Sequence, residues 1–89
     1  MRVLICGGGD VALLLARRMS REGNDVVVVE ADARRCEYLE EALDATIVRG
    51  HAASGRTLHR AGLTQADMLI AVTNSDEVNF LACLIAQNE

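Results

Sequence analysis

The chain has 89 residues, of which 51% are hydrophobic and 25% are charged, and its net charge at pH 7 is −4. An acidic chain whose arginines form no stripe is a poor partner for a phosphate backbone, so we expect no nucleic acid ligand. No apolar run approaches the ~20 residues of a transmembrane helix, so we expect no direct insertion into a membrane. The length suits one compact domain with a single core.

The first motif in the chain is a glycine-rich turn. An apolar strand over residues 3–6 is followed by the pattern G-x-G-x-x-A, formed by Gly7, Gly9 and Ala12, and then by a predicted helix over residues 11–22. Between a strand and a helix this pattern is typical of a dinucleotide site, because the small residues permit a tight turn, close approach of a pyrophosphate and close helix packing. The phosphates would lie over the helix N-terminus. The apolar face of this helix is expected to consist of Val11, Ala12, Leu15, Ala16 and Met19.

An acidic residue follows the second strand. The β-branched run at 26–29 predicts a parallel strand that is buried on both faces and therefore central. Glu30 comes next, about 20 residues after the glycines, where a carboxylate accepts hydrogen bonds from both hydroxyls of an adenosine ribose. We therefore predict a site for an adenosine nucleotide. Because Glu30 would repel a 2′-phosphate, NADP is disfavoured as the ligand.

Helices and strands continue to alternate along the rest of the chain. Helices are predicted over residues 33–43 and 55–61, and strands over residues 46–48 and 68–72. Asp32 and Ser54 are predicted to cap the two helices. Asn74, with Glu77 three residues later, fits the capping box of a last helix that runs to the chain end.

This alternation predicts an α/β fold. Right-handed crossovers give a Rossmann-like doubly wound parallel sheet of four strands in the order 3-2-1-4, truncated before the later strands. The ligand crevice of such a sheet lies outside the carboxyl ends of the strands, at the point where the strand order reverses. Its rim is expected to be formed by residues 7–10, 30–32, 50–52 and 73–77.

Several runs of residues resemble one known family. They are G-x-G-x-V-A at 7–12, Glu30 followed by Asp32 and Arg35, V-x-G-H-A at 48–52, A-G-L-x-x-A-D at 61–67, and A-V-T-N-S-D-E-x-N at 71–79. Together they cover essentially the whole chain. It resembles the nucleotide-binding N-terminal domain of TrkA-type potassium-uptake regulators, also called the domain that regulates potassium conductance.

The resemblance implies a domain that catalyses no reaction. In that family the domain binds NAD or NADH or, in some members, ATP or ADP, and it lies on the cytoplasmic face of a potassium transporter or channel. Nucleotide occupancy changes the geometry of a ring of assembled domains and thereby gates the pore. We therefore expect a cytoplasmic regulatory domain that its partner holds at the inner face of the cell membrane.

The resemblance also implies roles for individual residues. The backbone of the glycine turn and of Val11 would hold the pyrophosphate, and Glu30 would hold the adenosine ribose. His51 and Ala52 would border the adenine. Thr73 and its neighbour Asn74 would meet the second ribose or its phosphate. The candidate binding residues are Gly7, Gly8, Gly9, Asp10, Val11, Glu30, Ala31, His51, Ala52, Thr73 and Asn74.

The chain departs from the family pattern in two respects. Asp10 stands where the family usually has glutamine or a basic residue, and it brings a negative charge near the expected phosphates. The chain also ends at Glu89 within a helix, where the family domain has further strands and a helix. We therefore expect residues 1–89 to be a single domain and a fragment of a longer chain.

An alternative function is the cofactor-binding half of an NAD-dependent oxidoreductase, with its substrate domain after Glu89. All nine basic residues are arginine, so a catalytic lysine is excluded within this segment. His51 has no partner placed by sequence to make it a general base, and we predict no catalytic residue and no metal site. The cysteines are expected to be reduced and buried: Cys6, Cys36 and Cys83.

The last helix carries two apolar stripes. One can cover the sheet and consists of Val78, Leu81, Ala82 and Ile85. The other stripe, Phe80 and Leu84, has no predicted partner within the chain and favours association through burial of apolar surface. We therefore expect a homodimer or a higher ring formed through this helix.

Overall fold

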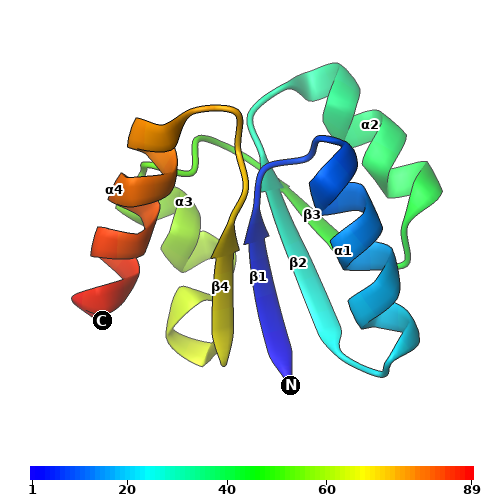
Figure 1. Ribbon diagram of the computed structural model, residues 1–89, viewed down its shortest axis with the longest axis horizontal. Helices are drawn as coiled ribbons and strands as arrows, with labels where there is room; N and C mark the ends of the chain where they lie inside the picture. Colours follow the sequence, from blue (N-terminus) through cyan, green and yellow to red (C-terminus); the bar gives the residue numbers. More distant parts are fainter.

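A computed structural model describes residues 1–89, in which strands and helices alternate along the chain (Figure 1). The strands are β1 (Arg2–Cys6), β2 (Asp25–Glu30), β3 (Thr46–Arg49) and β4 (Met68–Ala71). The α-helices are α1 (Asp10–Arg21), α2 (Ala33–Ala42), α3 (Gly55–Arg60) and α4 (Asp76–Gln87), and a 3-10 turn, η1 (Leu63–Gln65), precedes β4. None of these helices combines the length and the apolar composition that a membrane span needs.

The strands form one parallel sheet. Its order is β3-β2-β1-β4, which confirms the predicted Rossmann-like arrangement. Strand β1 pairs with β2 on one side and with β4 on the other, so Ile5 lies beside Val28 and Ile70. Strands β2 and β3 are therefore added on one side of β1, and β4 is added on the other side. This reversal of the strand order opens a crevice at the carboxyl ends of β1 and β4.

Two apolar clusters lie on opposite faces of the sheet. Side chains alternate along a strand, so Ile5 packs into one cluster with α1 and α2, whereas Leu4 packs into the other with α3 and α4. Leu39 of α2 and Leu58 of α3 are fully buried in these clusters. The helices cover both faces of the sheet (Figure 1), and this is why the two central strands consist of almost uninterrupted apolar residues.

The buried face of α1 differs from the prediction at its first apolar position. Val11 is 61% exposed, although it was expected to face the sheet. Ala12 and Ala16 form the buried face, with Leu15 and Met19 partly covered beside them. The reason is that α1 begins at Asp10, so Val11 lies in the first turn, beyond the end of β1, and lines the crevice instead.

The start of α4 also differs from the prediction. Ser75, not Asn74, is the N-cap, and its hydroxyl accepts a hydrogen bond from the Val78 backbone N–H at 3.2 Å. The predictions for Asp32 and Ser54 as caps are confirmed, since their side chains accept from the backbone N–H groups of Arg35 and Thr57. The capping box placed the last helix one residue too early.

Two further predictions on α4 were wrong. Leu81 is exposed, because it lies about 100° around the helix from Ala82, which faces the sheet and is fully buried. Cys83, which follows Ala82, is exposed as well, whereas Cys6 and Cys36 are buried as expected. Burial raises the pKa of the Cys6 thiol to about 11, so this thiol stays protonated at neutral pH.

The two clusters predict a large difference between two leucine substitutions. Leu58→Ala should lower the free energy of unfolding by about 2–5 kcal/mol, because it leaves a cavity in a fully buried site. Leu14→Ala is the matched control, because Leu14 is 65% exposed on α1 and should change stability by less than about 0.5 kcal/mol. Urea unfolding followed by circular dichroism measures both, and equal losses would contradict the assignment of the core.

Candidate functional site

A cleft of about 530 Å³ lies at the carboxyl ends of the strands. The loops that follow β1, β2, β3 and β4 all contribute to its wall, as the switch point between β1 and β4 requires. Every candidate binding residue from the sequence lines this cleft. Three further lining residues, Asp32, Gly50 and Ser75, belong to the rim expected from the sequence. The lining residues that the sequence analysis did not place at the cleft are Val29, Arg35, Val72 and Val78.

The glycine turn has a different constraint at each position. Gly7 has a φ of +111°, and a Cβ atom there would lie 2.9 Å from Thr73 N and from Val72 O. Gly7 therefore permits both the tight turn and the close packing of this turn against the β4–α4 loop. A Cβ atom on Gly9 would meet nothing within 4 Å, so the space above Gly9 is open toward the cleft.

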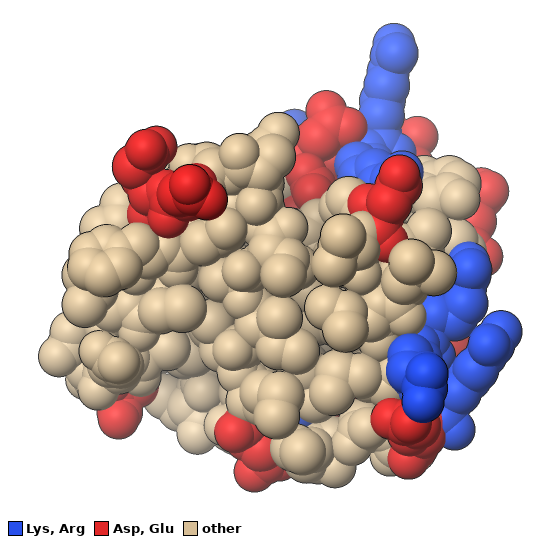
Figure 2. Space-filling model, viewed as in Figure 1, with Lys and Arg blue, Asp and Glu red and all other residues tan.

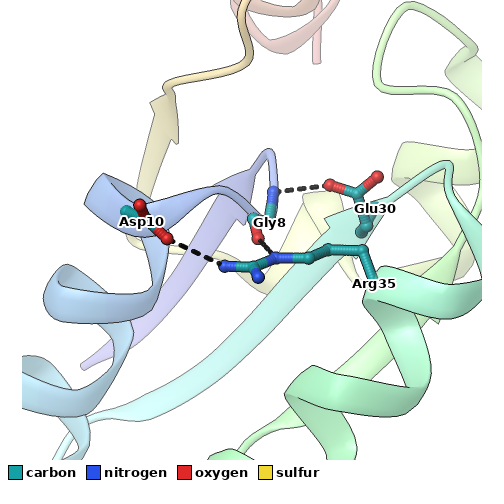
Figure 3. Close-up of polar contacts among 4 residues, drawn as sticks. All are labelled: Gly8, Asp10, Glu30 and Arg35. Atoms are coloured by element: carbon teal, nitrogen blue, oxygen red, sulfur yellow. Dashed lines mark hydrogen bonds and ion pairs between the residues drawn. The ribbon is translucent and has the colours of Figure 1, made fainter.

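Glu30 joins the glycine turn to the loop after β2. One carboxylate oxygen accepts a hydrogen bond from the Gly8 N–H at 2.7 Å, and the other accepts from the Asp32 N–H at 2.7 Å. Figure 3 shows this contact joining Gly8 in the turn after β1 to the Glu30 carboxylate at the end of β2. These bonds hold the carboxylate in a fixed orientation. An ionised carboxylate has about four acceptor positions, so both oxygens can still accept from a ligand.

Arg35 contacts the other side of the glycine turn. Its Nε donates a hydrogen bond to the Gly8 carbonyl, and one terminal nitrogen lies 3.4 Å from an Asp10 carboxylate oxygen (Figure 3). The guanidinium also lies 4.8 Å from the centre of the Tyr38 ring. Arg35 thus places a positive charge beside Asp10, which offsets the negative charge that the sequence puts near the expected phosphates.

The wall formed after β3 contains His51 and Ala52. Ala52 is buried, and the Ala53 N–H donates a hydrogen bond to His51 Nδ1 at 3.1 Å. Because Nδ1 accepts this bond, the proton of the neutral imidazole lies on Nε2. His51 therefore offers a donor at the cleft. The other histidine, His59, lies on α3 and contacts Glu89, away from the residues that line the cleft.

The loop between β4 and α4 is held by a side chain that the sequence analysis left out of the site. Asn79 of α4 makes hydrogen bonds with the backbone N–H, the carbonyl and the hydroxyl of Thr73. The only signal for it was its place as the last residue of the run at 71–79. Arg35 likewise belonged to one of the runs that resemble the family, the one that begins at Glu30. No spacing rule linked Arg35 or Asn79 to the cleft.

The cleft offers backbone donors together with a carboxylate acceptor. The first N–H groups of α1 have no partner within the helix. They lie at the positive end of the helix dipole, which favours an anion such as a phosphate. Glu30 accepts hydrogen bonds, which suits hydroxyl groups. No group of three or more histidine, cysteine, aspartate or glutamate side chains lies close enough together to hold a metal ion.

The sheet order and the position of the cleft define a Rossmann-like α/β domain with a cleft at its switch point. Within that class, the family model described as the TrkA-N domain matches residues 3–89. The chain belongs to the TrkA-N domain family.

One curated relative is the "Trk system potassium uptake protein TrkA" of Azorhizobium caulinodans. It is 47% identical over 88 residues, which cover 99% of this chain and 19% of the relative. The chain therefore spans about a fifth of that protein's length.

Solved structures with a similar fold include the Kef CTD of Shewanella denitrificans in its AMP-bound form. It has a TM-score of 0.86 at 18% identity and covers all of this chain and 53% of the solved chain. A putative betaketoacyl-ACP reductase has a TM-score of 0.66 at 22% identity, covering 97% of this chain and 42% of the solved one. At these identities the likeness shows the fold alone.

The surroundings of Gly7 in the glycine turn and of Gly23 after α1 predict unequal effects of two alanine substitutions. Gly23→Ala should lower the free energy of unfolding by about 1–2 kcal/mol, because Gly23 has a φ of +89° but open space around it. Gly7→Ala should cost more, because the same backbone strain is joined by a clash with the backbone of Val72 and Thr73. Urea unfolding of both variants tests this. Equal losses would mean that the glycine turn does not pack against the β4–α4 loop as described.

Proposed function

We propose that residues 1–89 are a nucleotide-binding regulatory domain of a potassium transport system and catalyse no reaction themselves. The observation that carries the proposal is the cleft at the switch point, where Glu30 is held in place opposite the open face of Gly9 and the first turn of α1. Membership of the TrkA-N family supports it, and so does the name of the Azorhizobium relative. We infer that the domain is one part of a longer chain.

The ligand that this cleft suits best is an adenosine nucleotide with free ribose hydroxyls. The ribose hydroxyls donate to Glu30, and the phosphates lie over Gly9 and the N-terminus of α1, where backbone N–H groups are unpaired. NAD or NADH fits this description, and ATP or ADP shares the same adenosine ribose. NADP is disfavoured, because its 2′-phosphate would meet the Glu30 carboxylate. The AMP-bound state of the similar Kef domain is consistent with this class of ligand.

A regulatory role accounts for the hydrogen bonds that polar side chains in the cleft accept from the backbone. The carboxylates of Glu30 and Asp32 accept hydrogen bonds from backbone N–H groups, and His51 Nδ1 does the same. These groups fix the loops around the ligand instead of presenting a free acid and base to it. The domain therefore reports nucleotide occupancy through the positions of its loops.

Helix α4 provides the surface through which we propose that copies of the domain assemble into a homodimer or a higher ring. Phe80 is 64% exposed and Leu84 is 38% exposed, and Leu81 is exposed beside them. Figure 2 shows uncharged surface over α4 below its acidic first turn. The membrane partner would be a potassium transporter or channel subunit, and the domain would lie at its cytoplasmic face.

Replacing Glu30 tests the ligand site. Glu30→Ala should weaken NADH binding by about 1.5–3 kcal/mol, because it removes a charged acceptor of the ribose hydroxyls. It should also reduce the discrimination against NADPH. Isothermal titration calorimetry measures both affinities, and the unfolding free energy of the variant shows how far the lost bonds to Gly8 and Asp32 disturb the loops.

Glu37→Ala is the control for charge, since Glu37 is exposed on α2 outside the cleft and should leave both affinities unchanged. Gly9→Val is the control for the phosphate position, because its side chain enters open space without disturbing the fold and should block the ligand. Unchanged NADH affinity in Glu30→Ala, or tight binding by Gly9→Val, would place the ligand elsewhere.

Charged substitutions on α4 test assembly. The wild-type chain should sediment as a dimer or larger species at high micromolar concentration, because association buries exposed apolar surface. The double variant Phe80→Glu with Leu84→Glu should sediment as a monomer. Leu14→Glu is the matched control, because Leu14 is an exposed leucine on another helix and should leave the association unchanged. A monomeric wild type would rule out this surface.

A further inference from the structure

Asn79 fixes the hydrogen-bonding state of Thr73 at the β4 end of the cleft. Asn79 Oδ1 accepts from the Thr73 backbone N–H at 2.9 Å and from its hydroxyl at 2.6 Å, and Asn79 Nδ2 donates to the Thr73 carbonyl at 3.2 Å. The amide orientation follows from chemistry, because a backbone N–H can only donate and must face the oxygen. Both donors of Thr73 are therefore directed to Asn79.

The Thr73 hydroxyl can only accept a hydrogen bond from a ligand, because its proton is already directed to Asn79. A hydroxyl has one proton and two lone pairs. Its 2.6 Å contact with Asn79 is shorter than its 3.1 Å contact with the Ser75 carbonyl, so the proton lies toward Asn79. The Ser75 N–H donates to one lone pair at 3.2 Å. One lone pair remains, and it can accept a hydrogen bond but cannot provide one.

Thr73 lies where the far end of a bound nucleotide would reach. Strands β2 and β4 flank β1, so Glu30 and Thr73 line the cleft on opposite sides of the glycine turn. A ligand whose adenosine ribose meets Glu30, with its phosphates over the first turn of α1, extends from there toward Thr73. The next chemical group along the ligand is a second ribose in a dinucleotide and a terminal phosphate in ATP.

The charges at the β4 end disfavour a terminal phosphate. Arg35 is the only arginine that lines the cleft, and it is paired with Asp10 and reaches Gly8 from α2. The first turn of α4 instead carries Asp76 and Glu77, and Figure 2 shows acidic side chains over this end of the helix. A phosphate near Thr73 would therefore find neither a free side-chain donor from Thr73 nor a cationic side chain.

We propose that Asn79 is a specificity-determining residue that makes this cleft select a dinucleotide, NAD or NADH, over ATP and ADP. It acts through Thr73 as a positioning residue. By taking both Thr73 donors, it leaves an acceptor that a ribose hydroxyl can satisfy and that an ionised phosphate, itself an acceptor, cannot. This inference rests on the proposed binding of adenosine nucleotides.

Calorimetric titration of the whole chain with NADH, ATP and AMP, in buffer with EDTA so that ATP carries no divalent cation, tests the proposal. Wild type should bind NADH more tightly than ATP. In Asn79→Ala the Thr73 hydroxyl can rotate its proton away from the position of Asn79 and toward a phosphate, so the preference for NADH should fall about two- to tenfold. AMP affinity should not change, because AMP does not reach Thr73. Asn88→Ala is the matched control, since Asn88 Nδ2 bonds only the Leu84 carbonyl within α4.

Thr73→Val provides a second variant if Asn79→Ala does not fold. It removes the acceptor but keeps the shape, so NADH affinity should fall several-fold while ATP and AMP affinities stay the same. An unchanged ratio of NADH to ATP affinity in Asn79→Ala, or an equal loss for all three ligands, would overturn the proposal. So would a wild type that binds ATP as tightly as NADH, although nucleotide binding would then stand. A wild type that binds none of the three would overturn the proposed function, and this inference with it.

Discussion

The cleft depends on the carboxylate of Glu30. It links the N–H of Gly8 to the N–H of Asp32 and so ties the turn after β1 to the loop after β2. On the other side of β1, the absence of a side chain at Gly7 lets the same turn pack against the backbone of Val72 and Thr73. The glycine turn is thereby clamped between its two neighbours in the sheet. The open space over Gly9 therefore lies above a turn that both neighbouring loops hold in place.

Much of the architecture could be predicted from local patterns. The alternation of apolar strands with capped helices determines the sheet order once crossovers are taken as right-handed, and the structure confirms that order. All candidate binding residues line the cleft because parallel strands bring their carboxyl ends to one edge, whatever side chains follow them. A residue that follows a strand, such as Glu30 or Thr73, can thus be placed at the cleft from sequence alone.

Other features depend on details that periodicity does not contain. Whether Val11 faces the sheet is decided by how far α1 extends beyond β1, and the exposure of Leu81 is decided by the rotation of α4 about its axis. The contacts of Arg35 with Gly8 and of Asn79 with Thr73 join segments whose distance is set only when the sheet has formed. Such side-chain contacts adjust the charge and the hydrogen-bonding capacity of the cleft, so the sequence predicts its position better than its selectivity.

Asn79 and Phe80 are consecutive residues of α4. One bonds the loop that borders the cleft, and the other is exposed on the surface through which we propose assembly. A rigid helix that carries both groups would join the two proposed equilibria, nucleotide binding and assembly of the domains. Thermodynamic linkage then requires reciprocity: the factor by which nucleotide occupancy changes the association constant of the domains equals the factor by which association changes the affinity for the nucleotide. The concentration of assembled domains would therefore set the nucleotide level to which the domain responds.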